Sequence, residues 1–270
     1  MSAEEKKEVM EANVTWQGEV AVLTINNVAR RNAISDPVKH DLSRHMNELS
    51  ASKKCRAIVL TGAGGFFSAG GDVKSMKERG AAGQSFIERR LRMGGILHTL
   101  VRQLVEGPKP VVTAVEGIAY GAGLALAMAS DWTVAAKGTR FAAAQILRGL
   151  APDGGLYYLL AARTNPGRAR ELLLSGRTFN ADDALNWGVA HELAEPGQTL
   201  DAALKAAERL ASVPPLAYAL TRAAMTNSYH TLEACFRAEQ DYQPVVGLSK
   251  DHKESVAAFL EKRKPVFTGE

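Results

Sequence analysis

Three stretches of the chain have the apolar pattern of β-strands. They are residues 19–25 (EVAVLTI), 56–62 (RAIVLTG) and 110–117 (PVVTAVEG), in which β-branched side chains are frequent. The first alternates apolar and polar positions, as a half-buried strand does, and the other two form short apolar runs bounded by glycine or proline. The sequence therefore predicts three strands in its first half.

A segment with helical periodicity follows each predicted strand. After the first strand, Ser35 or Asp36 can cap a helix and Pro37 suits its first turn. A glycine-rich loop and a long helical segment from Ser85 to Val105 follow the second strand, and the short apolar run GAGLALAMAS follows the third. Since strand, loop and helix recur with short connections, the sequence predicts an α/β core.

From about Leu200 the chain has helical periodicity alone. Four helical segments follow one another there, Pro214 and Pro215 start the second of them, and no convincing strand interrupts the series. The pattern predicts two parts, a core over residues 1–199 and a helical C-terminal region over residues 200–270.

Composition narrows the class of protein further. The 270 residues carry a net charge of +4 from 33 basic and 29 acidic side chains, a balance too even for neutralising a nucleic-acid backbone. The charge-free window 117–130 is shorter than the roughly 20 residues of a membrane span. Cys55 and Cys235 match no metal or disulfide pattern, and the charged N-terminus is no secretory signal, so we expect a cytoplasmic protein without a bound metal.

Two glycine-containing turns between a strand and a helix are the main candidates for chemistry, at residues 62–76 and 117–128. A dinucleotide fingerprint fits poorly, because Phe67 occupies the position of its third glycine. The first helical turns after these loops would leave the N–H groups of Gly71 and Ala122 free. Two such donors could form an oxyanion hole, but the glycines could also serve only tight turning, and spacing alone leaves both interpretations open.

Several longer motifs occur in a characteristic order. They are FSAGGDVKSM, AVEGIAYGAGLALAMASDWTVAAKGTRF, GLAPDGG and ARELLLSGRTFNADDALNWGVAHEL. Together they resemble the enoyl-CoA hydratase/isomerase family, the crotonase superfamily, over nearly the whole chain. The resemblance implies a spiral of repeated ββα units with a helical C-terminal region that forms homotrimers or hexamers. It also implies an acyl-CoA substrate without a further cofactor, whose thioester carbonyl accepts hydrogen bonds from Gly71 and Ala122.

The residues that activate water in hydratases of this family are missing. Their two glutamates correspond here to Ala125 and to Gln145, eight residues before Asp153. Alanine transfers no proton, and an amide can orient water but cannot act as its base. In several isomerase-type members, including those acting on dienoyl-CoA and on ring-epoxidised phenylacetyl-CoA, an aspartate at the position of Asp153 moves a proton or lies beside the reacting carbon. The motifs of this chain resemble those members most.

The leading hypothesis is therefore an enoyl-CoA double-bond isomerase in which Asp153 is the proton shuttle. Asp153 also suits the N-cap of a helix, so a purely structural role stays open. Three other functions remain. One is a hydratase or related lyase in which Gln145 and Asp153 share the handling of water, and another is an inactive member that binds CoA esters. The third is aryl-CoA dehalogenation with Asp153 as the nucleophile, although the aromatic residue that it would require at position 145 is absent.

The resemblance also implies positions that contact the substrate. Arg31 would lie near the CoA phosphates, Tyr120 beside the oxyanion donor could line the acyl pocket, and Phe259 and Lys262 would reach the adenosine end from a neighbouring subunit. The complete set of expected contacts is Arg31, Ala33, Ala69, Asp72, Val73, Tyr120, Gly121, Phe259 and Lys262.

Overall fold

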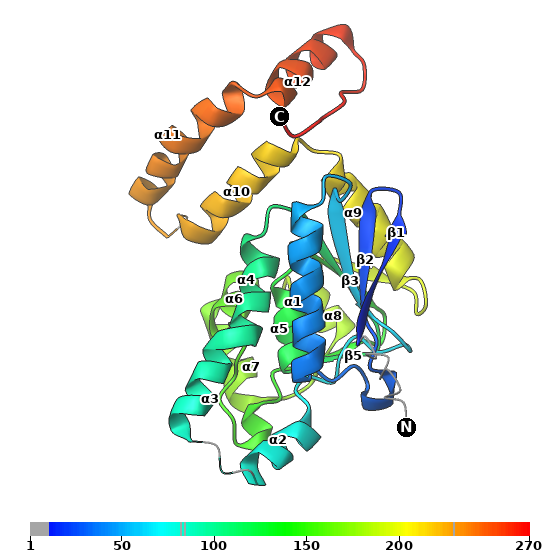
Figure 1. The fold of residues 1–270 in the computed structure, drawn as a ribbon, viewed down its shortest axis with the longest axis vertical. Coiled ribbons are helices and arrows are strands. Elements are labelled where there is room, and N and C mark those ends of the chain that lie inside the picture. Colours follow the sequence, from blue (N-terminus) through cyan, green and yellow to red (C-terminus); the bar gives the residue numbers. More distant parts are fainter. Residues whose placement is uncertain (1–10, 82, 84, 229) are drawn as a thin grey trace, which may run out of the picture.

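The computed structural model describes residues 11–270 apart from 82, 84 and 229 (Figure 1). Within these residues a six-stranded sheet has the order β1-β2-β3-β4-β6-β9, and a three-stranded sheet has the order β5-β7-β8. The large sheet is parallel except for the β1–β2 pair. The strands are β1 (Ala12–Gln17), β2 (Val20–Ile25), β3 (Ala57–Gly62), β4 (Val111–Val115), β5 (Ile118–Tyr120), β6 (Trp132–Ala136), β7 (Arg140–Ala142), β8 (Phe179–Asn180) and β9 (Glu192–Ala194).

Helices cover both faces of the large sheet (Figure 1). The α-helices are α1 (Asp36–Ala51), α2 (Val73–Ala81), α3 (Phe86–Arg92), α4 (His98–Glu106), α5 (Ala122–Met128), α6 (Leu156–Arg163), α7 (Pro166–Ser175), α8 (Ala181–Asn186), α9 (Thr199–Ala211), α10 (Pro215–Asn227), α11 (Leu232–Gly247) and α12 (Lys250–Glu261). The three predicted strands correspond to β2, β3 and β4, so the α/β class is confirmed.

Alternate side chains of the strands belong to two separate apolar clusters. In β2, Val20 and Val22 pack in the cluster under α9, whereas Leu23 and Ile25 pack in the larger cluster that contains α1 and α5. Strands with helices on both faces are buried on both sides, which explains the apolar runs of β3 and β4. For the same reason β2 is not the half-buried strand that its alternation predicted. The large cluster is the one that supports the candidate site.

Two helix predictions have different outcomes. Ser35 caps α1, because its Oγ accepts a hydrogen bond from the Val38 N–H at 3.3 Å. The segment from Ser85 to Val105 is not a single regular helix: a π-helical turn, Met93–Leu97, separates α3 from α4. This turn contains Gly94 and Gly95, whose low helix propensity weakens the regular hydrogen-bonding pattern.

The C-terminal helices divide into one that packs on the sheet and three that extend beyond it. Helix α9 lies against the sheet, whereas α10, α11 and α12 project from it (Figure 1). Arg222 of α10 attaches them to the core by an ion pair with Asp131 at 2.8 Å and by a hydrogen bond to the Leu104 carbonyl. None of the described helices combines the length and the apolar character needed to cross a membrane.

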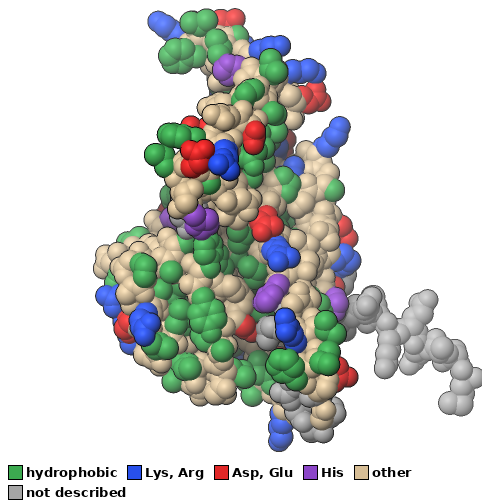
Figure 2. All heavy atoms as spheres, turned by 90° about the vertical axis from the view of Figure 1, so that its left-hand side faces the viewer, with side chains coloured by type: hydrophobic (Ala, Val, Ile, Leu, Met, Phe, Trp, Pro, Cys, Tyr) green, Lys and Arg blue, Asp and Glu red, His purple; other side chains and the backbone are tan. Residues whose placement is uncertain are grey.

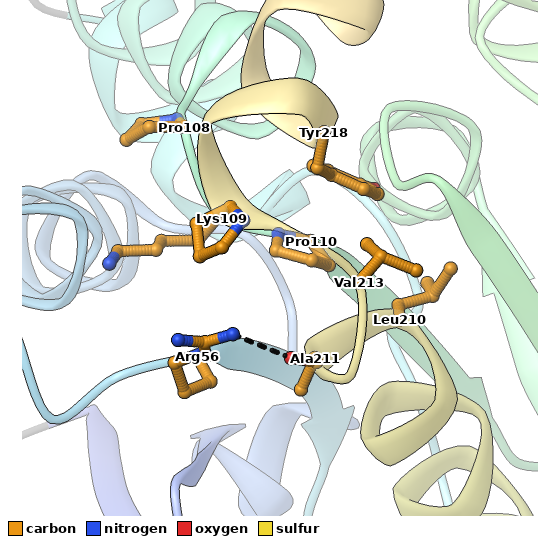
Figure 3. Close-up of a pocket in the computed structure, with 9 residues that line it drawn as sticks. Arg56, Pro108, Lys109, Pro110, Leu210, Ala211, Val213 and Tyr218 are labelled. Atoms are coloured by element: carbon orange, nitrogen blue, oxygen red, sulfur yellow. Dashed lines mark hydrogen bonds between the residues drawn. The ribbon is translucent and has the colours of Figure 1, made fainter. Parts of the chain in front are cut away.

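A small pocket lies where α9 and α10 meet the core (Figure 3). Arg56 donates hydrogen bonds there to the Ala211 and Phe267 carbonyls, each at 3.0 Å. The other residues that line the pocket are largely proline and aliphatic, and Lys109 and Tyr218 are the other polar side chains. These contacts fasten the C-terminal part of the chain to β3, and no residue of the predicted site lines this pocket.

Candidate active site

The loop that carries Gly71 is held against β5. The Ser68 N–H donates to the Ile118 carbonyl at 3.0 Å, and the Tyr120 N–H donates to the Ser68 carbonyl at 3.0 Å. Ser68 and Ala119 thus form a parallel bridge, so residues 67–70 lie beside β5 like a short extra strand. The two glycine-containing turns of the sequence are therefore neighbours in space.

The other side of this loop is held by residues 31–34. The Ala69 N–H donates to the Arg31 carbonyl at 2.9 Å, and the Ile34 N–H donates to the Gly70 carbonyl at 2.7 Å. Because backbone hydrogen bonds hold both edges, the direction of the following peptide groups is determined by the fold and not by their own side chains.

Asn32 lies beneath the loop and is completely buried. Its Nδ2 donates to the Ala63 and Phe66 carbonyls at 2.8 and 2.6 Å, and its Oδ1 accepts from the Asn27 N–H at 2.9 Å. Its φ of 55° lies in the left-handed region, which asparagine tolerates better than most residues. One side chain thereby connects the loop before α1 to the loop after β3.

The N–H groups of Gly71 and Ala122 are free donors at adjacent turns. Among the described residues, neither group donates to a protein acceptor. Gly70 has a φ of 91°, and a Cβ placed on it would lie 2.5 Å from the Tyr120 carbonyl oxygen and 3.6 Å from the Ala122 nitrogen. Only glycine allows this close approach. Two unpaired N–H groups on adjoining turns are the arrangement that an oxyanion hole requires.

Asp72 fixes the start of α2 directly after Gly71. Its carboxylate accepts hydrogen bonds from the Lys74 and Ser75 N–H groups at 3.0 and 3.3 Å, and it pairs with Arg30 at 2.6 Å. Burial alone would raise the pKa of Asp72, but the Ser75 hydrogen bonds and the Arg30 charge outweigh it and lower the pKa below 3.8. Asp72 is therefore an ionised cap that orients the Gly71 turn.

An apolar wall surrounds Ala125, the position that the resemblance assigns to the first glutamate of the hydratases. Ala125 is fully buried in α5, and a Cβ placed on Gly154 would lie 2.6 Å from the Ala125 Cβ. The same Gly154 position lies 3.9 Å from Leu97, so the turn that carries Asp153 packs directly on α5 and the end of the π-helical turn. Ala125 therefore leaves this wall without an ionisable group.

Gln145 and Asp153 are brought together by the chain between them. Gln145 Nε2 donates to Asp153 Oδ1 at 3.0 Å across the short 3₁₀ turn Ile146–Arg148. The N-cap of α6 is Gly155, with no side-chain cap, so Asp153 is not the helix cap that the sequence left open. Its carboxylate instead makes a contact with a second predicted site residue.

The other predicted contacts fall into two groups. Ala33, Ala69, Val73, Tyr120 and Gly121 lie on or next to the segments that carry the free donors, and Arg31, with a φ of 48°, lies over the Phe66 ring at 5.8 Å. Phe259 and Lys262 lie in and after α12, at the end of the molecule opposite α2 (Figure 1). One chain does not bring these two residues to the site.

Two residues near the donors were not recognised from the sequence. Asn32 holds the loop, and Met76 covers Gly71, since a Cβ on Gly71 would lie 2.4 Å from the Met76 Cε. Arg30, next to the expected contact Arg31, pairs with Asp72. The tolerance of asparagine for the left-handed region was the one signal for Asn32, and the place of Met76 depends on how α2 packs.

Comparison with known proteins agrees with this fold and geometry. Residues 15–270 match the family model described as enoyl-CoA hydratase/isomerase. The chain is 35% identical to 1,2-epoxyphenylacetyl-CoA isomerase of Escherichia coli (strain K12), covering 93% of this chain and 95% of the relative. It is 32% identical to the mevalonyl-coenzyme A hydratase of Beauveria bassiana (strain ARSEF 2860), covering 93% and 92%.

A solved structure shows the same architecture. An enoyl-CoA hydratase from Polaromonas sp. JS666 superposes with a TM-score of 0.89 at 31% identity, covering 95% of this chain and 99% of that one. This chain therefore belongs to the enoyl-CoA hydratase/isomerase family and has the crotonase fold of ββα units. It is an acyl-CoA enzyme of that family, as its sequence motifs predict.

Proposed function

We propose that the chain is an enoyl-CoA double-bond isomerase in which Asp153 carries the proton. The observation that supports this most is that the acid–base side of the site offers one carboxylate. The resemblance assigns Ala125 and Gln145 to the positions of the hydratase glutamates; Ala125 is buried, and Gln145 is hydrogen-bonded to Asp153. A single carboxylate can remove and return one proton, whereas the hydratases use two glutamates to hold and activate water.

In the proposed reaction the thioester carbonyl accepts hydrogen bonds from Gly71 and Ala122. The Asp153 carboxylate takes a proton from the α-carbon of a 3-enoyl ester, and the electron pair moves into a dienolate whose charge is on the carbonyl oxygen. The carboxyl group, which is partly exposed and can exchange its proton with water, then protonates the γ-carbon, which leaves the double bond between the α- and β-carbons. The two N–H groups stabilise the enolate, so the proposal calls for no metal or redox cofactor.

The relatives include both isomerases and hydratases, so they support both candidate functions. The similarity to an isomerase that acts on an epoxidised phenylacetyl-CoA supports the isomerase proposal. A hydratase or lyase is the second candidate, because a hydratase has nearly the same identity to this chain and because Gln145 could orient a water molecule for Asp153.

Assembly into trimers, alone or paired as hexamers, is part of the proposal. Hydrophobic side chains are exposed on the projecting helices, as Figure 2 shows for one face; Phe259 is 83% exposed, and Leu248 and Leu260 are also largely exposed. Exposed apolar groups of this size favour burial against another chain. In such an assembly Phe259 and Lys262 would contact the CoA of a neighbouring subunit. Because Cys55 and Cys235 are free thiols, we place the enzyme in the reducing cytoplasm.

The test is product analysis with 2-enoyl-CoA and 3-enoyl-CoA esters of several acyl types. We expect the double bond to move without a change in mass in ordinary water. Addition of water to the 2-enoyl ester would favour the hydratase instead. Binding of CoA esters without any product would show that the chain is an inactive member.

A further inference from the structure

The side-chain carboxylate of Asp153 has a single hydrogen-bond partner in the part of the chain that the structure describes. Gln145 Nε2 donates to its Oδ1 at 3.0 Å, and no described group donates to its Oδ2. A carboxylic acid carries its proton on one oxygen and can accept a hydrogen bond on the other. The Gln145 bond can therefore persist whether Asp153 is ionised or protonated, provided that the proton binds Oδ2.

The Gln145 side chain is fixed in this place by its surroundings. It is only 9% exposed. The backbone carbonyl of Gln145 accepts hydrogen bonds from the Arg148 and Leu150 N–H groups at 2.9 and 3.1 Å, which fixes the backbone at the 3₁₀ turn. On the opposite side, a Cβ placed on Gly121 would lie 3.5 Å from the Gln145 Cδ. The amide therefore packs between Asp153 and the residue that precedes the donor Ala122.

The other end of the amide has no competing bond. Oε1 of Gln145 is buried and has no hydrogen-bond partner among the described residues, although an unsatisfied buried acceptor costs about 1–3 kcal/mol. No other contact on the amide determines which end faces the aspartate, so the carboxylate of Asp153 alone attracts the NH₂ group. An amide also stays neutral throughout the pH range in which carboxyl groups titrate.

We propose that Gln145 is a positioning residue: its amide holds Oδ1 of Asp153 and thereby directs proton transfer to Oδ2. This inference rests on the proposed isomerase function. A glutamate at position 145, as in the hydratases, would place a second negative charge where the amide now lies, 3.0 Å from Oδ1 of Asp153. Two carboxylates at so short a distance do not ionise independently. The amide therefore suits a site that cycles one carboxyl group between its two states.

The test compares variants by the rate at which deuterium from the solvent enters the acyl group, over a range of pH. Gln145→Met keeps the volume and removes the donor. We expect kcat to fall about 10- to 100-fold, because poor positioning of the base loses part of the rate acceleration that general base catalysis supplies. KM should change less than about threefold. Gln145→Asn keeps an amide that is too short to reach Asp153, and should show the same loss.

Gln145→Glu separates positioning from space filling. At low pH its protonated carboxyl can donate to Asp153 as the amide does, so activity should return towards that of the wild type. As the pH rises both carboxyl groups ionise and repel one another, so the rate should fall, and the optimum should lie at lower pH than in the wild type. The methionine variant has no such group, so its loss should be independent of pH.

The outcomes for this inference and for the isomerase proposal differ. If Gln145→Met and Gln145→Asn exchange deuterium at the wild-type rate with an unchanged pH profile, Gln145 only fills space and the inference is wrong, while the isomerase proposal stands. If the wild-type enzyme neither moves the double bond nor incorporates deuterium, or if Asp153→Asn does both equally fast, the proposed function is wrong and the inference fails with it.

Discussion

The two halves of the site are built in different ways. The half that would bind the carbonyl consists of backbone N–H groups at Gly71 and Ala122, held by hydrogen bonds between three loop segments and β5. The half where a proton would move consists of the side chains of Ala125, Gln145 and Asp153, of which only Asp153 can carry the proton. The backbone half can be retained through many changes of side chain. In the side-chain half, by contrast, Ala125 and Gln145 at the positions that the resemblance assigns to the two glutamates are enough to remove the acid–base groups of a hydratase. The family can therefore keep one means of enolate stabilisation and vary the reaction that follows.

The halves should also respond differently to mutation. Changes to the backbone half act through packing and folding, because its supporting residues Asn32 and Gly70 are buried and lie behind the donors. Changes to the side-chain half should affect chemistry with little effect on folding. Four substitutions, taken from the largest expected effect to the smallest, test this distinction.

Asp153→Asn should have the largest effect. It removes the proposed base but keeps the size of the side chain, and the new amide can still bond to Gln145. We expect turnover to fall about 10²- to 10⁴-fold, while the binding of a CoA ester and the melting temperature change little. The control is Asp182→Asn, an exposed carboxylate at the start of α8. Turnover by Asp153→Asn at the control's rate would contradict the assignment of Asp153.

Gly70→Ala should break the backbone half. An added Cβ would meet the Tyr120 carbonyl oxygen at 2.5 Å and force the two donor turns apart, so we expect kcat to fall about 10²- to 10³-fold, as for the loss of one oxyanion donor. Gly65→Ala is the matched control, since Gly65 has a similar φ of 75° and open space around the added atom. Equal losses in both variants would show that strain in the loop, and not donor spacing, is responsible.

Asn32→Ala should reduce stability more than it changes the chemistry. It removes two donated hydrogen bonds and one accepted hydrogen bond from a fully buried position, so we expect the free energy of unfolding to fall by about 3 kcal/mol. Asn32→Gly loses the same bonds but relieves the left-handed strain and should cost less. Denaturant unfolding of the two variants checks this order, and an unchanged unfolding midpoint in both would contradict the role of Asn32.

Arg30→Ala should have the smallest effect. Arg30 is partly exposed, and ion pairs of this kind contribute about 1 kcal/mol or less. The pKa of Asp72 is lowered in the folded protein from its ordinary value of 3.8. The ionised carboxylate therefore stabilises the folded protein above pH 3.8, and this contribution is lost as the pH falls through the lowered pKa. The difference in stability between variant and wild type should therefore shrink in acid. A difference that grows in acid would show that the pair does not act through the ionised carboxylate.

Local patterns were sufficient to predict much of the fold. β-Branched runs identified β2, β3 and β4. The cap of α1 was predicted at Ser35 or Asp36, and the structure assigns it to Ser35. The other strands were not identified: β5, β7, β8 and β9 contain two or three residues each and show no period, and β1 and β6, with six and five residues, were also missed. The pairing of β5, β7 and β8 depends on contacts that are remote in the sequence.

The site was predictable only in part. Free N–H groups at Gly71 and Ala122 follow from helix starts, but their proximity depends on the bridge between Ser68 and Ala119. The exclusion of Asp153 as a cap depended on Gly155 adopting the left-handed conformation and starting α6. The contact between Gln145 and Asp153 arises because the intervening 3₁₀ turn reverses the chain, which no local pattern at these positions indicates.

The central claim is that a proton leaves the substrate to Asp153 while its carbonyl is bound by the two N–H groups. Mass spectrometry of a 3-enoyl-CoA ester after incubation in deuterated water tests it most directly. The account predicts that the wild-type enzyme yields a 2-enoyl ester that contains deuterium and no added water, and that Asp153→Asn yields neither change. Hydrated product from the wild type, or deuterium incorporation by Asp153→Asn at the wild-type rate, would contradict the account.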